Sequence, residues 1–194
     1  MPADYELIFR LHETEEIAYR LGYSDYPHNY DMFIQTIGMQ SNRQMMIDLR
    51  RTGETIGWLG VYREDLRSGY AYYHAVITPE HIGTGAGVEA SALYINFLFA
   101  VCNLRKVYGE SISPAYESFV SGLGRFFTEE AVLKRHFYYH GDYWDLHMLA
   151  AYREDWERLA PRYLKLLGAG APGETPVGLA DDELAEPPAA ASSS

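Results

Sequence analysis

Three glycines alternate in the segment Val76–Ala90, between the end of an apolar strand and the start of an apolar helix. They are Gly83, Gly85 and Gly87. Glycine lets the backbone approach a ligand closely and can turn successive N–H groups toward it. The N-terminus of the following helix adds a partial positive charge. The segment therefore indicates a binding site for a phosphate or pyrophosphate group.

Two common nucleotide-binding motifs do not fit this glycine segment. A Walker loop needs a lysine after its last glycine, where this chain has Val88. A dinucleotide-binding fingerprint that starts at Gly83 and Gly85 needs its third glycine at position 88, which is again Val88. The phosphate site is therefore of another type.

A third pattern matches the glycine segment. The series Pro79-Glu80-x-x-Gly83-x-Gly85-x-Gly87-x-Glu89-Ala90 resembles the pyrophosphate-binding motif of the GCN5-related N-acetyltransferases, the GNAT superfamily. Upstream, the stretch Glu54–Gly60 resembles the family's strand with an Ile-Gly pair. Downstream, three blocks resemble the end of the branch that contains ribosomal-protein N-terminal acetyltransferases and spermidine acetyltransferases: Phe127–Lys134, Gly141–Asp145 and Asp155-Trp156. The resemblance covers about residues 5 to 160.

The resemblance implies a fold and a reaction. The fold would be α/β (α+β), with a mixed, strongly bent central sheet flanked by helices and one splayed pair of strands. The enzyme would be an N-acyltransferase of the 2.3.1 class. It would move an acyl group, most commonly acetyl from acetyl-CoA, to a primary amine by direct attack in a ternary complex. The acceptor would be a small-molecule or peptide amine, and a homodimer is one assembly found in this branch.

The resemblance also assigns the donor-binding residues. The splay would lie between the strand that ends at Thr78 and the strand that ends at Ile112. The backbone from Ala75 to Ile77 would meet the pantetheine arm and the oxyanion, and the loop would meet the pyrophosphate. The expected donor-binding set is Ala75, Val76, Ile77, Ile82, Gly83, Thr84, Gly85, Ala86 and Gly87.

Several positions depart from the family pattern and keep alternatives open. Glu80 replaces the usual glutamine or arginine, Ile82 replaces a frequent arginine, and Pro114-Ala115 lacks a frequent asparagine. One alternative is therefore a GNAT enzyme with another donor: a different acyl-CoA, an acyl-carrier protein or an aminoacyl-tRNA. A second is a noncatalytic module that binds acyl-CoA. In that alternative, the base would be missing because Tyr72 stands near the place of the glutamate that serves some members as base.

Two residues are candidates for the base that deprotonates the amine. His74 shares a strand face with Tyr70, Tyr72 and Val76, and the intrinsic pKa of histidine suits proton transfer near neutral pH. The competing interpretation is a packed structural histidine. Glu110 is the second candidate, and its competing interpretation is an exposed or paired carboxylate.

Two hydroxyl groups are candidates for the acid that protonates the departing thiolate. Ser118 matches a serine that the family retains, although it could simply be a hydroxyl at a helix start. Tyr116 is the other candidate, and it could equally be part of a pocket wall.

The sequence does not predict a metal site. His136, His140, His147 and Asp145 fall on one hairpin, where four-residue spacing does not gather side chains as it does on a helix. The single cysteine, Cys102, excludes a disulfide framework and a cysteine-based zinc site within one chain.

The composition is that of a globular domain. The chain has 194 residues, 47% of them apolar, and a net charge of −11, which disfavours nonspecific binding to DNA or RNA. No run of residues approaches the ~18 apolar residues of a membrane span, so we expect a cytoplasmic protein without a membrane partner. Residues 1–167 are expected to form the acyltransferase domain. Residues 168–194, rich in Gly, Ala and Pro and acidic, are expected to form a flexible tail.

Hydrophobic periodicity predicts alternating helices and strands. The sequence predicts helices over Thr14–Leu21, Tyr30–Met39, Gly87–Val101, Pro114–Leu123 and Glu154–Leu167. It predicts strands over Gln44–Leu49, Thr55–Tyr62, Tyr70–Thr78, Arg105–Ile112, Val132–Tyr139 and Tyr143–Tyr152. The last two strands would form a hairpin across His140-Gly141-Asp142.

Overall fold

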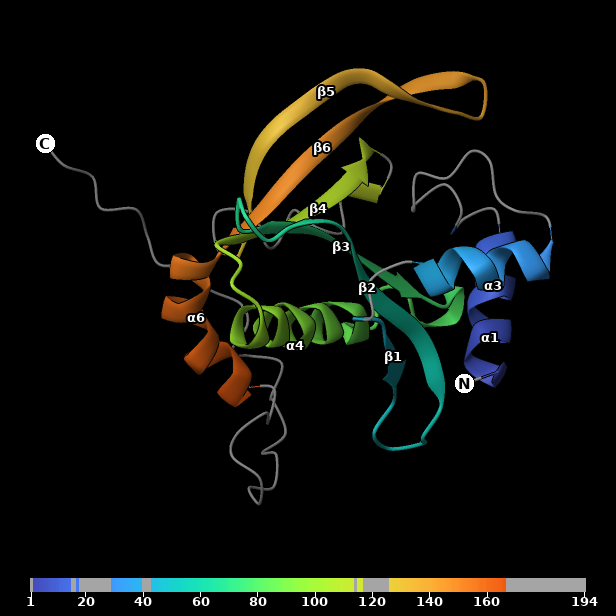
Figure 1. Cartoon of the computed structure of the whole chain (residues 1–194), viewed down its shortest axis with the longest axis horizontal. Helices are drawn as coiled ribbons and strands as arrows, with labels where there is room; N and C mark the ends of the chain where they lie inside the picture. Colours follow the sequence, from blue (N-terminus) through green and yellow to red (C-terminus); the bar gives the residue numbers. More distant parts are fainter. Residues whose placement is uncertain are drawn as a thin grey trace, which may run out of the picture.

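The computed structural model describes residues 2–14, 17, 29–39, 43–113, 115–116 and 126–166. Its elements, in chain order, are α1 (Pro2–Glu13), α3 (Tyr30–Met39), β1 (Met45–Asp48), β2 (Thr55–Asp65), β3 (Tyr70–Ile77), the 3-10 turn η1 (Pro79–His81), α4 (Ala86–Val101), β4 (Lys106–Ile112), β5 (Thr128–Tyr139), β6 (Asp142–Tyr152) and α6 (Arg153–Leu166). Figure 1 shows the sheet between α4 on one side and α1 with α3 on the other, and the β5–β6 hairpin extending beyond both.

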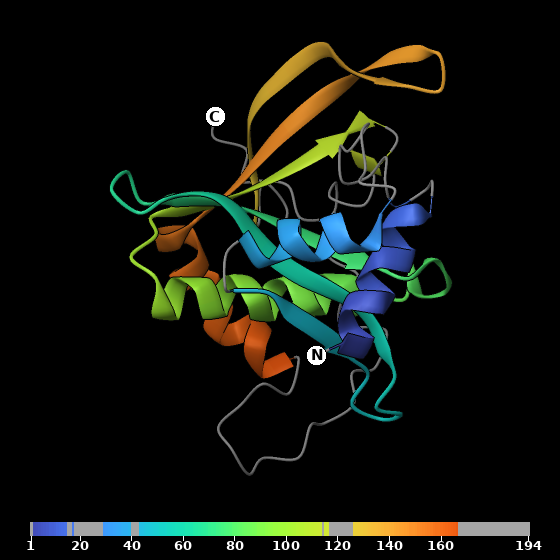
Figure 2. The same cartoon turned by 45° about the vertical axis from the view of Figure 1, so that its right-hand side comes forward.

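The six strands form one mixed sheet in the order β1-β2-β3-β4-β6-β5. Only β3 and β4 are parallel, and they pair over four residues, from Tyr70 opposite Lys106 to Tyr73 opposite Gly109. Beyond that pair, β3 stays with β2 while β4 stays with β6, so the two parallel strands diverge, as Figure 2 shows. The splayed pair expected from the resemblance is present, and it opens after Tyr73 and Gly109.

The two faces of the sheet bury different helices. Val61, Ala71, Tyr73 and Val107 pack with α4 and with Trp156 of α6 in the larger core. The opposite face contributes Trp58 and Val76, which pack with Ile8 and Leu11 of α1 and Phe33 of α3 in a smaller core. Because strand side chains alternate between faces, Tyr62, Tyr72, His74, Tyr108 and Glu110 lie on the same face as Trp58.

Local sequence explains the main boundaries. The helix α4 is apolar nearly all round, and it buries Tyr94, Ile95, Leu98 and Phe99 in the core with the sheet and α6. Its other face is not covered, since Val88, Leu93 and Val101 are exposed. The β5–β6 turn uses His140 at φ 52° and Gly141 at φ 82°, a left-handed geometry that favours glycine. This turn is at the predicted position.

The structure differs from the prediction at the N-terminus. The chain is helical from Pro2 to Glu13, where no element was predicted, and the helix ends where Thr14 was expected to cap the start of the next one. The Thr14 hydroxyl instead hydrogen bonds to the Arg10 carbonyl, 3.2 Å away. Apart from Thr14 and Ile17, the helix predicted over Thr14–Leu21 falls outside the described residues.

Two strands are longer than predicted. β2 continues to Asp65 through a bulge in which Arg63 adopts φ 48°, so part of the predicted polar connection Arg63–Gly69 is strand. β5 begins at Thr128 and not at Val132. Of the helix predicted over Pro114–Leu123 only residues 115 and 116 are described, and residues 167–194 are likewise outside the described part.

Candidate functional site

The glycine loop connects the end of β3 to the start of α4. Gly83 and Gly85 have φ angles of 81° and 86°, a left-handed conformation that side chains with a Cβ disfavour. Gly85 is the N-cap of α4, and no side chain supplies a capping hydrogen bond there. The Ala86 N–H makes one long hydrogen bond, 3.4 Å, to the Thr84 hydroxyl, and the first turn presents the positive end of the helix to an anionic ligand.

Two features of the loop hold it close to the sheet: a tight contact at Gly87 and side-chain hydrogen bonds within the loop. A Cβ on Gly87 would lie 3.0 Å from Ile77 Cγ1, so a larger residue there would require the Ile77 side chain to shift. The Thr84 hydroxyl donates to the His81 carbonyl at 2.8 Å, and Thr78 Oγ1 lies 2.9 Å from His81 Nδ1. Ile82, where the family often has arginine, is 38% exposed, so any anion here is held by backbone rather than by a cation at that position.

The open edges of the splay carry backbone N–H groups. Thr78 N–H donates to the Ile56 carbonyl at 2.8 Å, and alternation along an antiparallel ladder then turns the N–H groups of Ala75 and Ile77 away from β2, toward the splay. Val76 N–H points to β2 by the same rule, and the Val76 side chain is buried in the smaller core. Of the predicted pantetheine contacts, Ala75 and Ile77 therefore have suitable backbone directions.

The same argument applies to β4. Arg153 N–H donates to the Arg105 carbonyl at 2.9 Å across the β4–β6 ladder. Alternation then directs the N–H groups of Glu110 and Ile112 toward β3. The Glu110 N–H belongs to the last parallel rung, Tyr73 with Gly109, whereas the Ile112 N–H lies beyond the end of the β3–β4 pairing. Donors from both strands thus face one opening, which is the arrangement that stabilises a developing oxyanion.

The two base candidates flank the point where the strands diverge. His74 follows Tyr73 and Glu110 follows Gly109, the last paired residues, and both side chains lie on the face opposite α4. Tyr62 lies between them. Its hydroxyl donates to Glu110 Oε2 at 3.0 Å, and its ring centroid is 6.0 Å from that of His74. The sequence could not reveal this adjacency, because it depends on where the β3–β4 pairing ends.

His74 is poorly placed to act as a base. Burial, followed by the charge of the nearby His12, lowers the pKa of His74 to about 4. Its Nε2 is buried and has no hydrogen-bond partner among the described residues. A Cβ on Gly60 would lie 2.8 Å from that nitrogen, so the ring lies directly against β2. A base of such low pKa gains little by taking a proton from an ammonium group.

Glu110 is more accessible and remains hydrogen-bonded. Its side chain is 20% exposed, and Arg63 Nη1 lies 3.4 Å from its Oε1. The neighbouring Tyr72 ring stacks on Tyr108, with centroids 4.9 Å apart. Burial, and then the charge of Glu110, raises the pKa of Tyr72, so Tyr72 is a neutral hydrogen-bonding group and not a base at neutral pH.

A second carboxylate on this face was not identified from the sequence. Glu130 accepts hydrogen bonds from Lys106 Nζ at 2.9 and 3.0 Å, from the Tyr108 hydroxyl at 2.6 Å and from the Tyr152 hydroxyl. Burial acts to raise the pKa of Glu130, but these hydrogen bonds and the Lys106 charge outweigh it and hold the pKa at about 2. Strand alternation alone could not assign Glu130 to this face, since a bulge next to Glu130 sets the direction of its side chain.

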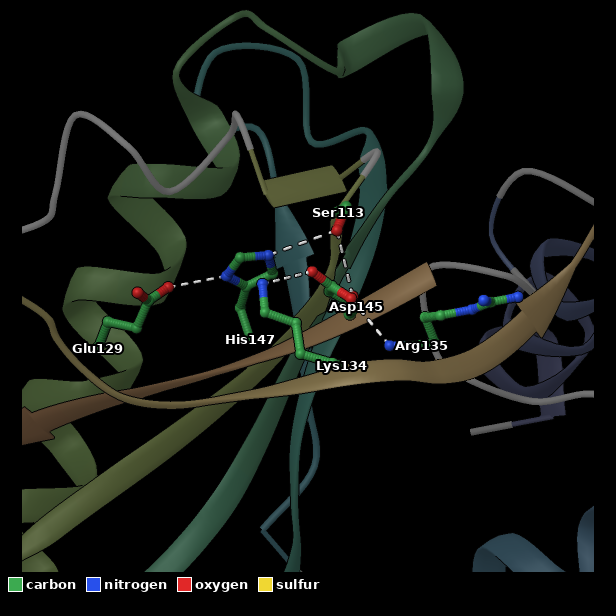
Figure 3. Close-up of polar contacts among 6 residues, drawn as sticks. All are labelled: Ser113, Glu129, Lys134, Arg135, Asp145 and His147. Carbon is green, nitrogen blue, oxygen red and sulfur yellow. Dashed lines mark hydrogen bonds and ion pairs between the residues drawn. The ribbon is translucent and has the colours of Figure 1, made fainter. Parts of the chain in front are cut away.

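On the α4 side of the sheet, a serine, a histidine and a glutamate from three segments come together (Figure 3). His147 Nδ1 lies 2.7 Å from Glu129 Oε1, and its Nε2 lies 3.4 Å from Ser113 Oγ. Tyr116, the predicted acid, stacks on the His147 ring at 3.8 Å. The other predicted acid, Ser118, lies outside the described residues. His147 had been considered only as a metal ligand.

The remaining hairpin residues do not gather around His147. Asp145 accepts hydrogen bonds from Lys134 Nζ and from the Arg135 backbone N–H, each at 2.8 Å. Within the described ranges, no group of three or more His, Cys, Asp or Glu side chains is arranged to hold a metal ion. No helix in the same ranges is long and apolar enough to cross a membrane.

Comparison with solved structures identifies the fold. Spermidine N-acetyltransferase from Vibrio cholerae, solved with CoA and spermine, matches with a TM-score of 0.70 and 20% identity, over 81% of this chain and 94% of that one. The fold is the GNAT fold. The spermidine/spermine N-acetyltransferase from Vibrio cholerae solved with manganese ions matches with a TM-score of 0.65 and 19% identity, over 84% of this chain and 92% of that one. No model of a known protein family matches the sequence, and no curated protein matches it.

The GNAT fold accounts for the sequence motif that suggested it. The glycine segment forms the connection from β3 to α4, directly beside the splay between β3 and β4. The mixed sheet and flanking helices expected from the resemblance are both present. The fold expected from the ordered series of sequence blocks is therefore the fold of the described residues.

Proposed function

We propose that this protein is an N-acyltransferase that transfers an acetyl group from acetyl-CoA to a primary amine by direct attack in a ternary complex. The observation that carries the proposal is the combination of left-handed glycines and a helix N-terminus directly after β3 with the divergence of β3 from its parallel neighbour β4. The loop would hold the pyrophosphate, and the N–H groups of Ala75 and Ile77 would bind the pantetheine arm and the thioester oxygen.

The acceptor amine would approach from the face opposite α4. That face offers the Glu110 carboxylate and the rings of Tyr62, Tyr72 and Tyr108, which together suit a cationic amine. The Vibrio cholerae structure with CoA and spermine supports a polyamine as the first acceptor to try. The net charge of −11 is compatible with such a substrate.

Glu110 is the proposed base. It borders the divergence point, is partly exposed, and keeps a Tyr62 hydroxyl on one oxygen. His74 has the same position on the other strand but is buried, so its role in this proposal is to pack beside Tyr62. Tyr116 is the proposed acid for the thiolate, because it lies on the opposite face, beside His147.

The donor site is tested by titration calorimetry with acetyl-CoA and with free CoA. We expect micromolar binding of both by the native protein and none by Gly85→Glu, which would place a side chain and a negative charge in the cradle. The matched control is Gly53→Glu, since Gly53 also has a positive φ, 71°, and open space but lies in the β1–β2 turn. Equal CoA affinity of the Gly85 variant and native protein would contradict the phosphate assignment.

The base is tested by acetylation of spermidine and other amines. Glu110→Gln is expected to lower kcat by about 100-fold or more with unchanged CoA affinity, because a general base contributes about that much. His74→Leu should retain most of kcat. If His74→Leu loses activity and Glu110→Gln keeps it, His74 is the base.

The binding experiment also separates the other donors. Absence of binding to both CoA and acetyl-CoA by the native protein would indicate that Ile82 reports a changed donor, and carrier-protein and aminoacyl-tRNA donors would then be tried. Binding of CoA without turnover on any amine would support the noncatalytic alternative.

A further inference from the structure

We propose that Ser113, His147 and Glu129 form a second reactive centre, in which Ser113 takes up an acyl group and releases it to water. The protein would thus hydrolyse activated esters and acyl thioesters without an amine. The proposal rests on the proposed function only for the identity of the natural donor, because an activated ester needs no CoA site.

The three side chains are in contact in the order serine, histidine, glutamate. This is the arrangement in which a nucleophile contacts its base and a carboxylate orients that base. Ser113 Oγ lies 3.4 Å from His147 Nε2, and His147 Nδ1 lies 2.7 Å from Glu129 Oε1. In Figure 3, Ser113 and Glu129 lie on opposite sides of the imidazole. The long serine contact is typical of a site without substrate.

The Glu129 carboxylate determines which nitrogen of the His147 imidazole carries a proton. An ionised Glu129 only accepts hydrogen bonds, so the His147 nitrogen next to it must be N–H. In the neutral form of the imidazole, the other nitrogen, Nε2, then has a lone pair available for the Ser113 proton. The hydrogen bond from His147, and then that from Tyr116, lowers the pKa of Glu129, which keeps this carboxylate ionised near neutral pH.

The surroundings hold the imidazole in place but leave the serine reachable. Tyr116 stacks on the His147 ring with an angle of 18° between planes, and only 14% of the His147 side chain is exposed. Ser113 is partly exposed and directly follows Ile112, the last residue of β4. Its hydroxyl has one other acceptor, the Asp145 carbonyl, also at 3.4 Å, so it is not committed to a short structural hydrogen bond.

The location separates this centre from the groups assigned to the amine. His147 is opposite Ser111 in the β4–β6 ladder, and its neighbours on the same face, Leu149 and Ala151, are buried; Ala151 belongs to the core with α4. Glu110 and His74 lie on the other face. The trio is therefore beside the splay but is not needed to deprotonate an acceptor there.

The proposed steps conserve atoms and charge. Ser113 Oγ attacks the acyl carbonyl carbon, and its proton passes to His147 Nε2. The bond from carbon to sulfur, or to the alcohol oxygen of an ester, breaks, and the leaving group takes that proton. Water then attacks the serine ester with His147 again as base, the acid is released and Ser113 regains its proton.

The test uses p-nitrophenyl acetate with the full chain, followed by stopped-flow absorbance and by mass spectrometry. We expect a burst of nitrophenol, an added acetyl group on the peptide that contains Ser113, and loss of both in Ser113→Ala. His147→Gln should slow the burst at least about 100-fold. Glu129→Gln should slow it and shift the pH profile, whereas Glu129→Asp should restore part of the rate.

Matched controls separate chemistry from damage to the fold. Ser111→Ala changes a buried serine on the same strand, whose hydroxyl bonds to the Ile112 carbonyl, and His136→Gln changes an exposed histidine of the same hairpin. Both should keep the native burst, and all variants should keep the native unfolding midpoint. A native burst in Ser113→Ala, acetyl on another residue, or no burst in the native protein overturns the proposal.

The two proposals can fail separately. An acetylated Ser113 in a protein that binds neither CoA nor acetyl-CoA would leave the second centre standing and remove the proposed donor. If the native protein gives no burst and Ser113→Ala acetylates spermidine at the full rate, the proposed N-acyltransferase stands and the second centre is ruled out.

Discussion

Two buried imidazoles make the stability of this fold sensitive to mild acid. His12 on α1 lies 4.8 Å from the Trp58 ring, and His74 on β3 lies 5.9 Å from the same ring, measured between centroids. Burial lowers the pKa of His12 to about 4, against a hydrogen bond to the Ile8 carbonyl that acts to raise it. Burial and the charge of His12 lower the pKa of His74 to about 4.

The direction of the effect follows from which state binds the proton first. The ordinary histidine pKa is 6.5, so as the pH falls below 6.5 the unfolded chain is protonated while the folded protein is not. The free energy of unfolding is therefore unaffected by these groups above about pH 6.5. Below that pH it falls by about 1.4 kcal/mol per pH unit for each histidine, and it stops falling below about pH 4. At pH 5 the loss is about 2 kcal/mol per histidine, and slightly less than twice that for the pair, because the charge of His12 is one cause of the low pKa of His74.

Urea unfolding at pH 7 and at pH 5 measures this loss. His74→Leu removes one imidazole, and with it a buried nitrogen without a partner, so its stability at pH 7 should equal or exceed that of the native protein. Its loss between the two pH values should be about 2 kcal/mol smaller than the native loss. His12→Asn should reduce the loss between the two pH values by a similar amount. The exposed-site control His136→Asn should show the same loss as the native protein. Equal losses in the native protein and in both buried-site variants would refute the reasoning.

Two further substitutions test packing and charge. Gly57→Ala would place a Cβ 2.0 Å from the Val76 carbonyl oxygen, so it should lower the free energy of unfolding in urea by more than about 3 kcal/mol. The control Gly53→Ala has open space around the new Cβ and a φ of 71°, so it should lower the same free energy by only about 1 kcal/mol. Glu130→Gln would leave Lys106, whose side chain is 10% exposed, without its counter-charge, at a cost of about 3 kcal/mol. The double variant Glu130→Gln with Lys106→Met should recover most of that loss, and failure to recover would show that the ion pair is not the cause.

The parts of the site that could be predicted are those set by neighbours in the sequence. Alternate glycines followed by an apolar helix are a local pattern, and the loop before α4 has the left-handed angles that this pattern requires at Gly83 and Gly85. The boundaries of α3 and α4 and the β5–β6 turn are also local, and they were predicted to within a residue. The register that joins these elements is not local.

The parts that could not be predicted depend on contacts between distant segments. The helix α1 has a mean hydropathy close to neutral and is defined mainly by packing of Ile8 and Leu11 against Trp58 and Phe33. A sequence pattern cannot supply that partner surface. In the same way, Ser113 directly follows β4, Glu129 lies in β5 and His147 lies in β6, and the β4-β6-β5 order brings them together.

The end of β3–β4 pairing determines what each side of the opening can do. Because the last rung is Tyr73 with Gly109, the next residues on the two strands project to the same face, and these are His74 and Glu110. A shift of the divergence by one residue would place Ala75 and Ser111 at that border and leave the acceptor face without a carboxylate there. The proposed chemistry therefore depends less on any motif than on the residue at which the two strands stop pairing.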